Sequence, residues 1–164
     1  MMAMTSSLVL WGFVATVAMT TIMQASQGLG LSRLSLPFLM GTFITGRRDV
    51  ATVLGFLLYV LGGWIFAALY FWFFASFGIF TWWLGAMTGF LHGLFLLVTI
   101  PLLPSIHPRM ASEYHGATSQ RQLEPPGFLA TNYGYQTPAI TLLAQTVYGT
   151  TLGACLQIQD IMSI

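Results

Sequence analysis

The stretch 50-VATVLGFLLYVLGGWIFAALYFWFFASF-77 decides the fold of this chain, because it contains no charged side chain over a length that exceeds a bilayer. A spanning helix needs about 20 predominantly apolar residues, so a helix over 50–77 must tilt or protrude. Three further runs satisfy the same criterion, at about 7–25, 82–103 and 139–157. The sequence therefore predicts an all-α polytopic membrane protein, with residues 1–164 forming one four-transmembrane-helix bundle.

The composition of the chain agrees with this prediction. Of its 164 residues, 56% are hydrophobic and 5% are charged, whereas soluble domains carry about 25% charged residues. A net charge of +1 without a basic stripe excludes nucleic acid as a partner. The single cysteine, Cys155, excludes an intrachain disulfide and a cysteine-based metal cluster. Because residues 1–10 carry no charge, we expect the first run to be a retained helix rather than a signal peptide.

Two connections between the runs are long enough to have structure of their own. The segment 34–45 is apolar but too short to span, and Ser35 and Pro37 suit the start of a helix. We predict a short interfacial or re-entrant helix there, and the alternative is an apolar loop packed on the bundle. The polar loop 105–137 contains Pro125-Pro126-Gly127, which interrupts any long helix, and is expected to cap one face of the bundle.

The arginines predict the orientation of the bundle. The chain has no lysine, and its five arginines lie in two connections on the same side of a four-helix bundle: Arg33, Arg47 and Arg48 in one, Arg109 and Arg121 in the other. The positive-inside rule places such loops in the cytoplasm. We therefore expect loops 31–49 and 105–137 to be cytoplasmic and both termini to lie outside. Arg47, Arg48, Arg109 and Arg121 are also candidates for binding lipid phosphates or for holding the loop cap.

Small residues recur every fourth position in the predicted spans. They are Gly85, Gly89 and Gly93 in the third run, Gly149 and Gly153 in the fourth, and Gly55, Gly63 and Ala67 in the second. Such stripes let helix backbones approach closely in lipid, where hydrophobic driving force between helices is absent. They predict a compact bundle, and a homodimer through one stripe remains open.

His92 is the one histidine, acid or base well inside a predicted span. Intramembrane ionisable residues are functional candidates by default, and His92 could ligate haem, relay a proton or bind a polar head group. The alternative is a neutral His92 that hydrogen-bonds a neighbouring helix through Gln145, Tyr59 or a threonine. Tyr59, Gln145 and Tyr148 follow the same small-residue faces and complete the set of intramembrane polar candidates.

The polar loop holds a second group of possible ligands. His107, Glu113 and His115, with Glu124 as an alternative carboxylate, have the atom types that zinc prefers. Their spacing matches no recognised zinc motif, so we expect no metal here. Arginine–glutamate pairing or contact with lipid explains the same residues.

Several stretches together resemble the uncharacterised YagU-like family of small bacterial inner-membrane proteins. They are Gly12-Phe-Val-Ala-Thr-Val-Ala-Met-Thr20, Gly55-x3-Tyr59-x2-Gly62-Gly63-x2-Phe66-Ala67-x2-Tyr70, Trp83-x-Gly85-x3-Gly89-x2-His92 with Pro101, and Gln145-x2-Tyr148-Gly149-x3-Gly153. The resemblance covers the four runs but not loop 105–137. It implies a four-helix bundle in the bacterial inner membrane and no particular activity. Relatives tend to carry histidine where this chain has Tyr59 and Gln145.

We therefore expect a non-enzymatic membrane protein that serves as an accessory or structural subunit, packing against lipid or a larger membrane complex. Bound lipid is expected and no other cofactor is predicted; the partners are membrane lipids and a larger complex or a homo-oligomer. One alternative is a transporter or channel component with a polar path along the fourth run and His92. Another is a haem- or metal-dependent membrane enzyme.

Overall fold

The computed structural model describes residues 2–113 and 122–162, and within them the chain is helical without a named strand. Four long helices dominate, α1 (Met2–Gly28), α3 (Arg48–Phe77), α4 (Trp82–Thr99) and α6 (Thr137–Met162). Shorter elements are α2 (Leu36–Ile44), η1 (Ile100–Leu102), α5 (Leu103–Ile106) and η2 (Phe128–Tyr133). The all-α prediction is confirmed. Each of the four long helices has the length and apolar composition of a membrane span, and the third of these spans continues through η1 and α5. The chain is thus an integral membrane protein.

The third span continues beyond residue 103, where the sequence predicts its end, and past two prolines. Pro101 lies at the start of η1 and Pro104 at the start of α5, so the apolar segment runs from Trp82 to Ile106. A proline is tolerated in the first turn of a helix, because the amide that it lacks has no intrahelical partner there. The two prolines therefore divide this segment into successive short helices instead of ending it.

The segment between α1 and α3 is a helix, as predicted, and not a loop. The Ser35 hydroxyl accepts a hydrogen bond from the Phe38 amide at 3.4 Å, and Pro37 lies in the first turn of α2. α2 packs directly on α3, because a Cβ at Gly41 would strike the Ala51 carbonyl and a Cβ at Gly55 would strike the Pro37 carbonyl. The absence of side chains at these two glycines lets a helix too short to span lie against α3.

Two helix pairs are joined through small residues. Between α4 and α6, a Cβ at Gly85 would strike the Gly149 carbonyl, and a Cβ at Gly89 would strike that of Gln145. Between α1 and α3, a Cβ at Gly63 would collide with the Thr16 side chain. The small-residue stripes thus lie where these backbones approach most closely.

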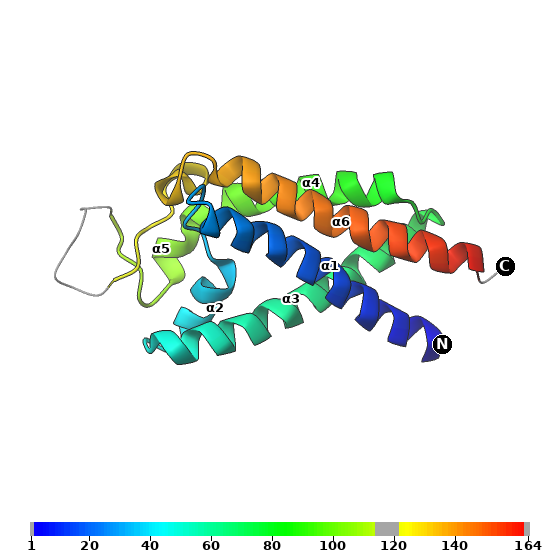
Figure 1. The fold of residues 1–164 in the computed structure, drawn as a ribbon, viewed down its shortest axis with the longest axis horizontal. Helices are drawn as coiled ribbons and strands as arrows, with labels where there is room; N and C mark the ends of the chain where they lie inside the picture. The colour runs from blue at the N-terminus through cyan, green and yellow to red at the C-terminus, as the bar shows by residue number, and fades with distance from the viewer. Residues whose placement is uncertain (1, 114–121, 163–164) are drawn as a thin grey trace.

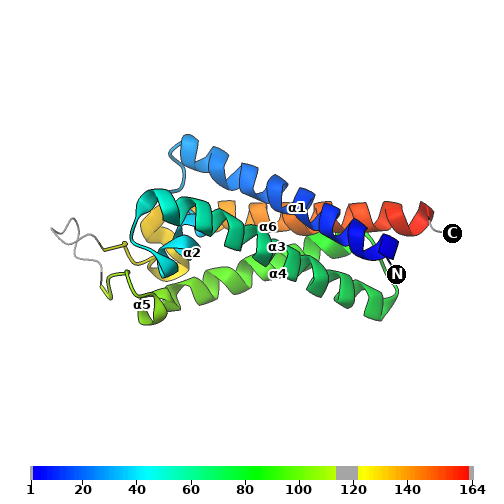
Figure 2. The ribbon, with the colours of Figure 1, turned by 90° about the horizontal axis from the view of Figure 1, so that it is seen from below.

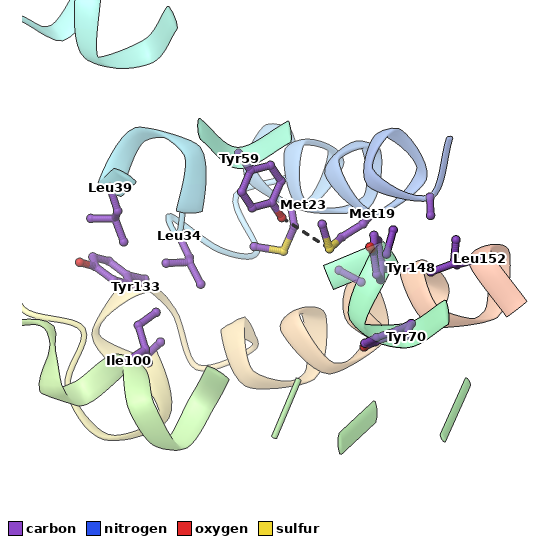
Figure 3. Packing of buried hydrophobic residues seen from close by; sticks show 14 of the residues in the cluster. Met19, Met23, Leu34, Leu39, Tyr59, Tyr70, Ile100, Tyr133, Tyr148 and Leu152 are labelled. Atoms are coloured by element: carbon purple, nitrogen blue, oxygen red, sulfur yellow. Dashed lines mark hydrogen bonds between the residues drawn. The ribbon is translucent and has the colours of Figure 1, made fainter. Parts of the chain in front are cut away.

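The helices α3 and α4 are not parallel along the bundle. Figure 1 shows α3 and α4 meeting at the turn 78–81 and diverging towards the end that holds α2 and α5. Both termini lie at the opposite end, and the view in Figure 2 agrees. Buried side chains lie along the length of the interior. Figure 3 shows Leu34, Leu39, Ile100 and Tyr133 near the α2 end, and Met19, Tyr59, Tyr70 and Tyr148 further along.

Candidate functional site

A cavity of about 440 Å³ lies between the diverging helices. Its walls come from all four long helices and from α2, η1 and α5. Most of the lining is apolar: Met19, Leu36, Leu39, Met40, Phe43, Phe66, Leu96, Ile100, Leu102, Leu103 and Ile106, with Gly62 and Gly63. Exposed Leu102 and Ile106 mark where this lining reaches the surface of the bundle. A volume of this size, with an apolar wall and few polar groups, is typical of a small-molecule site.

The four intramembrane polar candidates all line this cavity. Tyr59 and Tyr148 come from α3 and α6, His92 from α4 and Gln145 from α6. The structure brings them together because they lie on helix faces that also carry the small residues. Tyr148 donates to the Gly63 carbonyl at 2.7 Å. Tyr59 donates to the Met19 sulfur at 3.5 Å, as the dashed line in Figure 3 shows.

His92 has a partner that the sequence did not single out. Its Nδ1 lies 3.1 Å from the Tyr70 hydroxyl, which is also 3.3 Å from the Thr88 carbonyl. The Phe66 ring lies 4.1 Å from the imidazole, centroid to centroid, at an interplanar angle of 33°. Tyr70 follows Tyr59 by eleven residues, close to three helical turns, so helical periodicity alone would have placed it on the same face. Tyr70 and Phe66 together hold the imidazole in place.

Two buried polar atoms on side chains that line the cavity have no hydrogen-bond partner in the described part of the chain. They are Nε2 of His92 and Oε1 of Gln145, and Gln145 is only 4% exposed. An unpaired buried polar group carries a desolvation cost, so each unsatisfied group in a structure calls for an explanation. By contrast, Thr146 and Thr150 donate to carbonyls of their own helix, at 2.7 and 2.8 Å. Their hydroxyls are thus used locally instead of forming a polar row along α6.

One arginine of the polar loop, Arg109, has a structural role. The Arg109 guanidinium donates to the carbonyls of Thr42, Phe43 and Ile44, at 2.6, 3.1 and 3.5 Å. These carbonyls end α2 and lack intrahelical donors, so Arg109 caps the helix. Arg47 and Arg48 are exposed at the start of α3, where Arg47 pairs with Asp49 at 3.0 Å. Arg121 lies outside the described residues.

Arg33 joins the connection between α1 and α2 to the polar loop. Arg33 pairs with Glu124 at 3.0 Å and donates to the Asn132 carbonyl at 2.5 Å. Tyr133 donates to the Glu124 carbonyl at 2.6 Å. Burial, with a smaller contribution from the charge of Glu124, raises the pKa of Tyr133 to about 12. The loop is therefore an ordered cap over this end of the bundle where it is described.

His107 is buried among hydrogen-bond partners. Its Nδ1 accepts from the Arg109 amide at 3.2 Å, so its Nε2 carries the proton and lies 3.2 Å from both the Leu39 carbonyl and the Thr42 hydroxyl. Both ring nitrogens are thus engaged within the fold. No group of three potential metal ligands is found among the described residues, which include Glu113 but not His115.

Comparisons with protein-family models, with curated proteins and with solved structures give no match to this chain. The resemblance to the YagU-like family therefore stays a prediction.

Proposed function

We propose that this chain is a non-enzymatic membrane protein that binds an apolar molecule of the bilayer in the cavity between α2, α3, α4 and α6. The observation that carries the proposal is the cavity itself. Its apolar wall reaches the surface of the bundle at Leu102 and Ile106, which are 63% and 68% exposed. A molecule from the surrounding lipid can therefore enter it and place an apolar chain against the lining.

The chemistry of the lining supports binding rather than catalysis. Its polar side chains are the neutral amide Gln145, the hydroxyls of Tyr59, Tyr148 and Thr99, and the imidazole of His92. The lining residues include no carboxylate, cysteine, serine, lysine or arginine. Tyr70 orients His92, but no carboxylate or second imidazole stands beside it among the lining residues to take part in acid–base chemistry. The mostly apolar wall suits the enclosure of an apolar chain.

The glycine at position 62 allows a direct test of this proposal. Gly62 lines the cavity, and a Cβ built there meets no atom within 4 Å. Gly62→Leu should therefore put its side chain into the cavity without disturbing the helices. Gly28→Leu is the matched control, because Gly28 also has open space around its Cβ but does not line the cavity.

The measurement is native mass spectrometry of protein extracted from membranes, with identification of co-extracted apolar molecules. We expect the wild-type chain and Gly28→Leu to retain a bound molecule and Gly62→Leu to lose most of it. Equal retention by all three proteins would refute the proposal.

The wider role that we propose is that of an accessory or structural subunit. Large apolar side chains remain exposed along α3 and α4, among them Ile65, Trp72 and Leu91, and these fit lipid tails or the apolar helix of a partner. Native co-purification from gently solubilised membranes is the test. Repeated recovery of the chain without any partner would contradict the accessory role while leaving the binding proposal intact.

We also propose that the protein lies in the bacterial inner membrane with loops 31–49 and 105–137 in the cytoplasm. Arg33, Arg47 and Arg109 lie in the connections at the α2 end, away from both termini (Figure 1). In a Cys155→Ala background, an impermeant thiol reagent should label Met162→Cys in intact cells and Arg48→Cys only after permeabilisation. The reverse pattern would invert the proposed orientation.

A further inference from the structure

The mouth of the cavity lies beside a positive charge. Three of the lining residues are exposed and form this mouth: Phe43 of α2, Leu102 of η1 and Ile106 of α5. Arg109 follows Ile106 by three residues, and its Nη1 donates to the Phe43 carbonyl at 3.1 Å. The guanidinium is therefore bonded to the backbone of a mouth residue, at the edge of a mostly apolar lining.

Arg109 keeps a hydrogen-bond donor for a ligand. A guanidinium has five N–H groups, and the bonds that Arg109 makes through it to Thr42, Phe43 and Ile44 use only Nη1 and Nη2. Its Nε has no partner in the described part of the chain. A Cβ at Gly46 would lie only 3.4 Å from this Nε, so the glycine leaves open a nitrogen that a larger residue would cover.

Arg109 also differs from two other arginines at this end of the bundle in having no counter-charge. Arg33 pairs with Glu124 and Arg47 with Asp49, whereas no carboxylate of the described residues lies within ion-pair distance of Arg109. A guanidinium matches the oxygens of a phosphate in both charge and geometry. The mouth therefore suits a phosphate that comes from outside the chain.

The cavity behind the mouth is as deep as one leaflet of a membrane. Its lining on the third span extends from Ile106 to His92, about 20 Å at 1.5 Å per residue, and His92 lies near the middle of the span Trp82–Ile106. One leaflet of the hydrocarbon core is about 15 Å thick. An acyl chain that enters at the mouth can therefore follow the apolar lining to about the middle of the membrane.

We infer that the molecule in the cavity is a phospholipid, with one acyl chain along the lining and its phosphate at the mouth, where it accepts a hydrogen bond from Arg109 Nε. The inference rests on the proposed function, because it specifies which molecule of the bilayer the cavity binds. Arg109 then has two roles: Nη1 and Nη2 cap α2, and Nε binds the ligand.

The test is photocrosslinking of the full-length protein in maltoside micelles. The probe is a phosphatidylglycerol with a diazirine on one acyl chain. The competitors are dioleoylphosphatidylglycerol and galactosyl dioleoylglycerol, which share their chains and differ in the phosphate. We expect the phospholipid to compete roughly tenfold better, the effect of one charge-assisted hydrogen bond. A diazirine near the carboxyl end of the chain should label the mouth, and one near the methyl end should label the lining around Phe66 and His92.

Two variants should remove the preference for the phospholipid and leave competition by the galactolipid unchanged. Gly46→Leu covers Nε but spares the bonds that cap α2, which unchanged amide exchange in α2 would verify. Its matched control is Gly28→Leu, which adds the same side chain where a Cβ meets no atom within 4 Å. Arg109→Gln removes the donor itself. Its matched control is Arg47→Gln, which removes the same charge from an exposed arginine that does not line the cavity.

The outcomes separate the inference from the function on which it rests. Equal competition by the two lipids in the wild-type chain would overturn the inference, as would a preference that survives both Gly46→Leu and Arg109→Gln. An equal loss in Arg47→Gln would overturn it too, because net charge alone would then explain the preference. Displacement of the probe by millimolar inorganic phosphate would assign the site to a free anion instead of a lipid. Crosslinking that Gly62→Leu does not reduce relative to Gly28→Leu would overturn the binding proposal itself.

Discussion

Adding one methyl group at Gly149 should separate α4 from α6. In Gly149→Ala, the new Cβ would lie 2.9 Å from the Gly89 nitrogen and 3.0 Å from the Gly85 carbonyl carbon, and closer still to the Gly85 oxygen, whereas ordinary contacts begin at 3.4 Å. These neighbours are backbone atoms, which cannot rotate away as a side chain would. The helices must therefore move apart along a contact that Gly85, Gly89 and Gly153 share.

The expected cost follows from packing. Overfilling a tight contact costs about 1–3 kcal/mol, and a separated pair also loses the dispersion contacts that hold helices together in lipid. The ratio of folded to unfolded protein should thus fall by roughly ten- to a hundredfold, at 1.4 kcal/mol per factor of ten. Denaturation in mixed detergent micelles, followed by tryptophan fluorescence, measures this change.

Gly62→Ala is the matched control for the effect of a methyl group within a helix. A Cβ at Gly62 meets nothing within 4 Å, so the substitution should be neutral, or stabilising by up to about 1 kcal/mol through helix propensity. If Gly149→Ala and Gly62→Ala unfold at the same detergent composition, the glycine contact between α4 and α6 does not hold the bundle together as argued.

Two further predictions concern the cap over the α2 end. Arg109→Ala should destabilise the protein by about 1–2 kcal/mol and speed amide exchange in α2, because the carbonyls that end the helix lose a charged donor. Arg109→Lys should recover part of the lost stability. Unchanged amide exchange in both variants would show that the cap is dispensable. Because the pKa of Tyr133 is raised to about 12, against about 10 in an unfolded chain, its neutral form contributes stability below pH ~10 that is lost as the pH rises towards 12. Unfolding measured across that range should depend less on pH in Tyr133→Phe, and identical profiles would argue against the raised pKa.

The spans, the short helix and the small-residue contacts were predictable because each depends on local pattern. Hydropathy over 50–77 and the Ser35 cap indicate helices without any tertiary information. The stripes indicate close approach, but not which helices approach. Gly63 follows the four-residue spacing and faces Thr16, whereas Gly62 faces open space, because a helix turns about 100° per residue. The spacing identifies Gly63 as a contact residue but does not name Thr16 of α1 as its partner.

The residues of the candidate site were predictable from the sequence, but the cavity and the hydrogen bonds between these residues were not. Tyr59, His92, Gln145 and Tyr148 were singled out as polar residues within spans, and the structure places all of them on one cavity. The cavity itself depends on the divergence of α3 and α4, which no local pattern encodes. The same is true of the pairing between His92 and Tyr70, because the partner of a buried polar group depends on the angle at which two helices cross.

Some polar residues make structural hydrogen bonds, although the sequence alone also allowed other roles for them. His107 was considered a metal ligand, but its nitrogens hydrogen-bond to α2 and to the Arg109 backbone. Asp49 and Thr81 have helix-capping residue types, yet Asp49 lies within the first turn of α3, and Thr81 precedes α4 without a side-chain capping bond. Local propensity indicates where a helix starts, whereas the tertiary partners decide what each polar atom bonds.

The arginine that caps α2 also has a consequence for biosynthesis. Arg109 is separated by more than sixty residues from the carbonyls of Thr42 and Phe43 to which it donates. Because a chain is made from its N-terminus, α2 emerges well before its donor and before the two spans that separate them. The bonds that cap its end can form only after α3 and α4 have been synthesised, so the C-terminal end of α2 is completed as a late step of assembly.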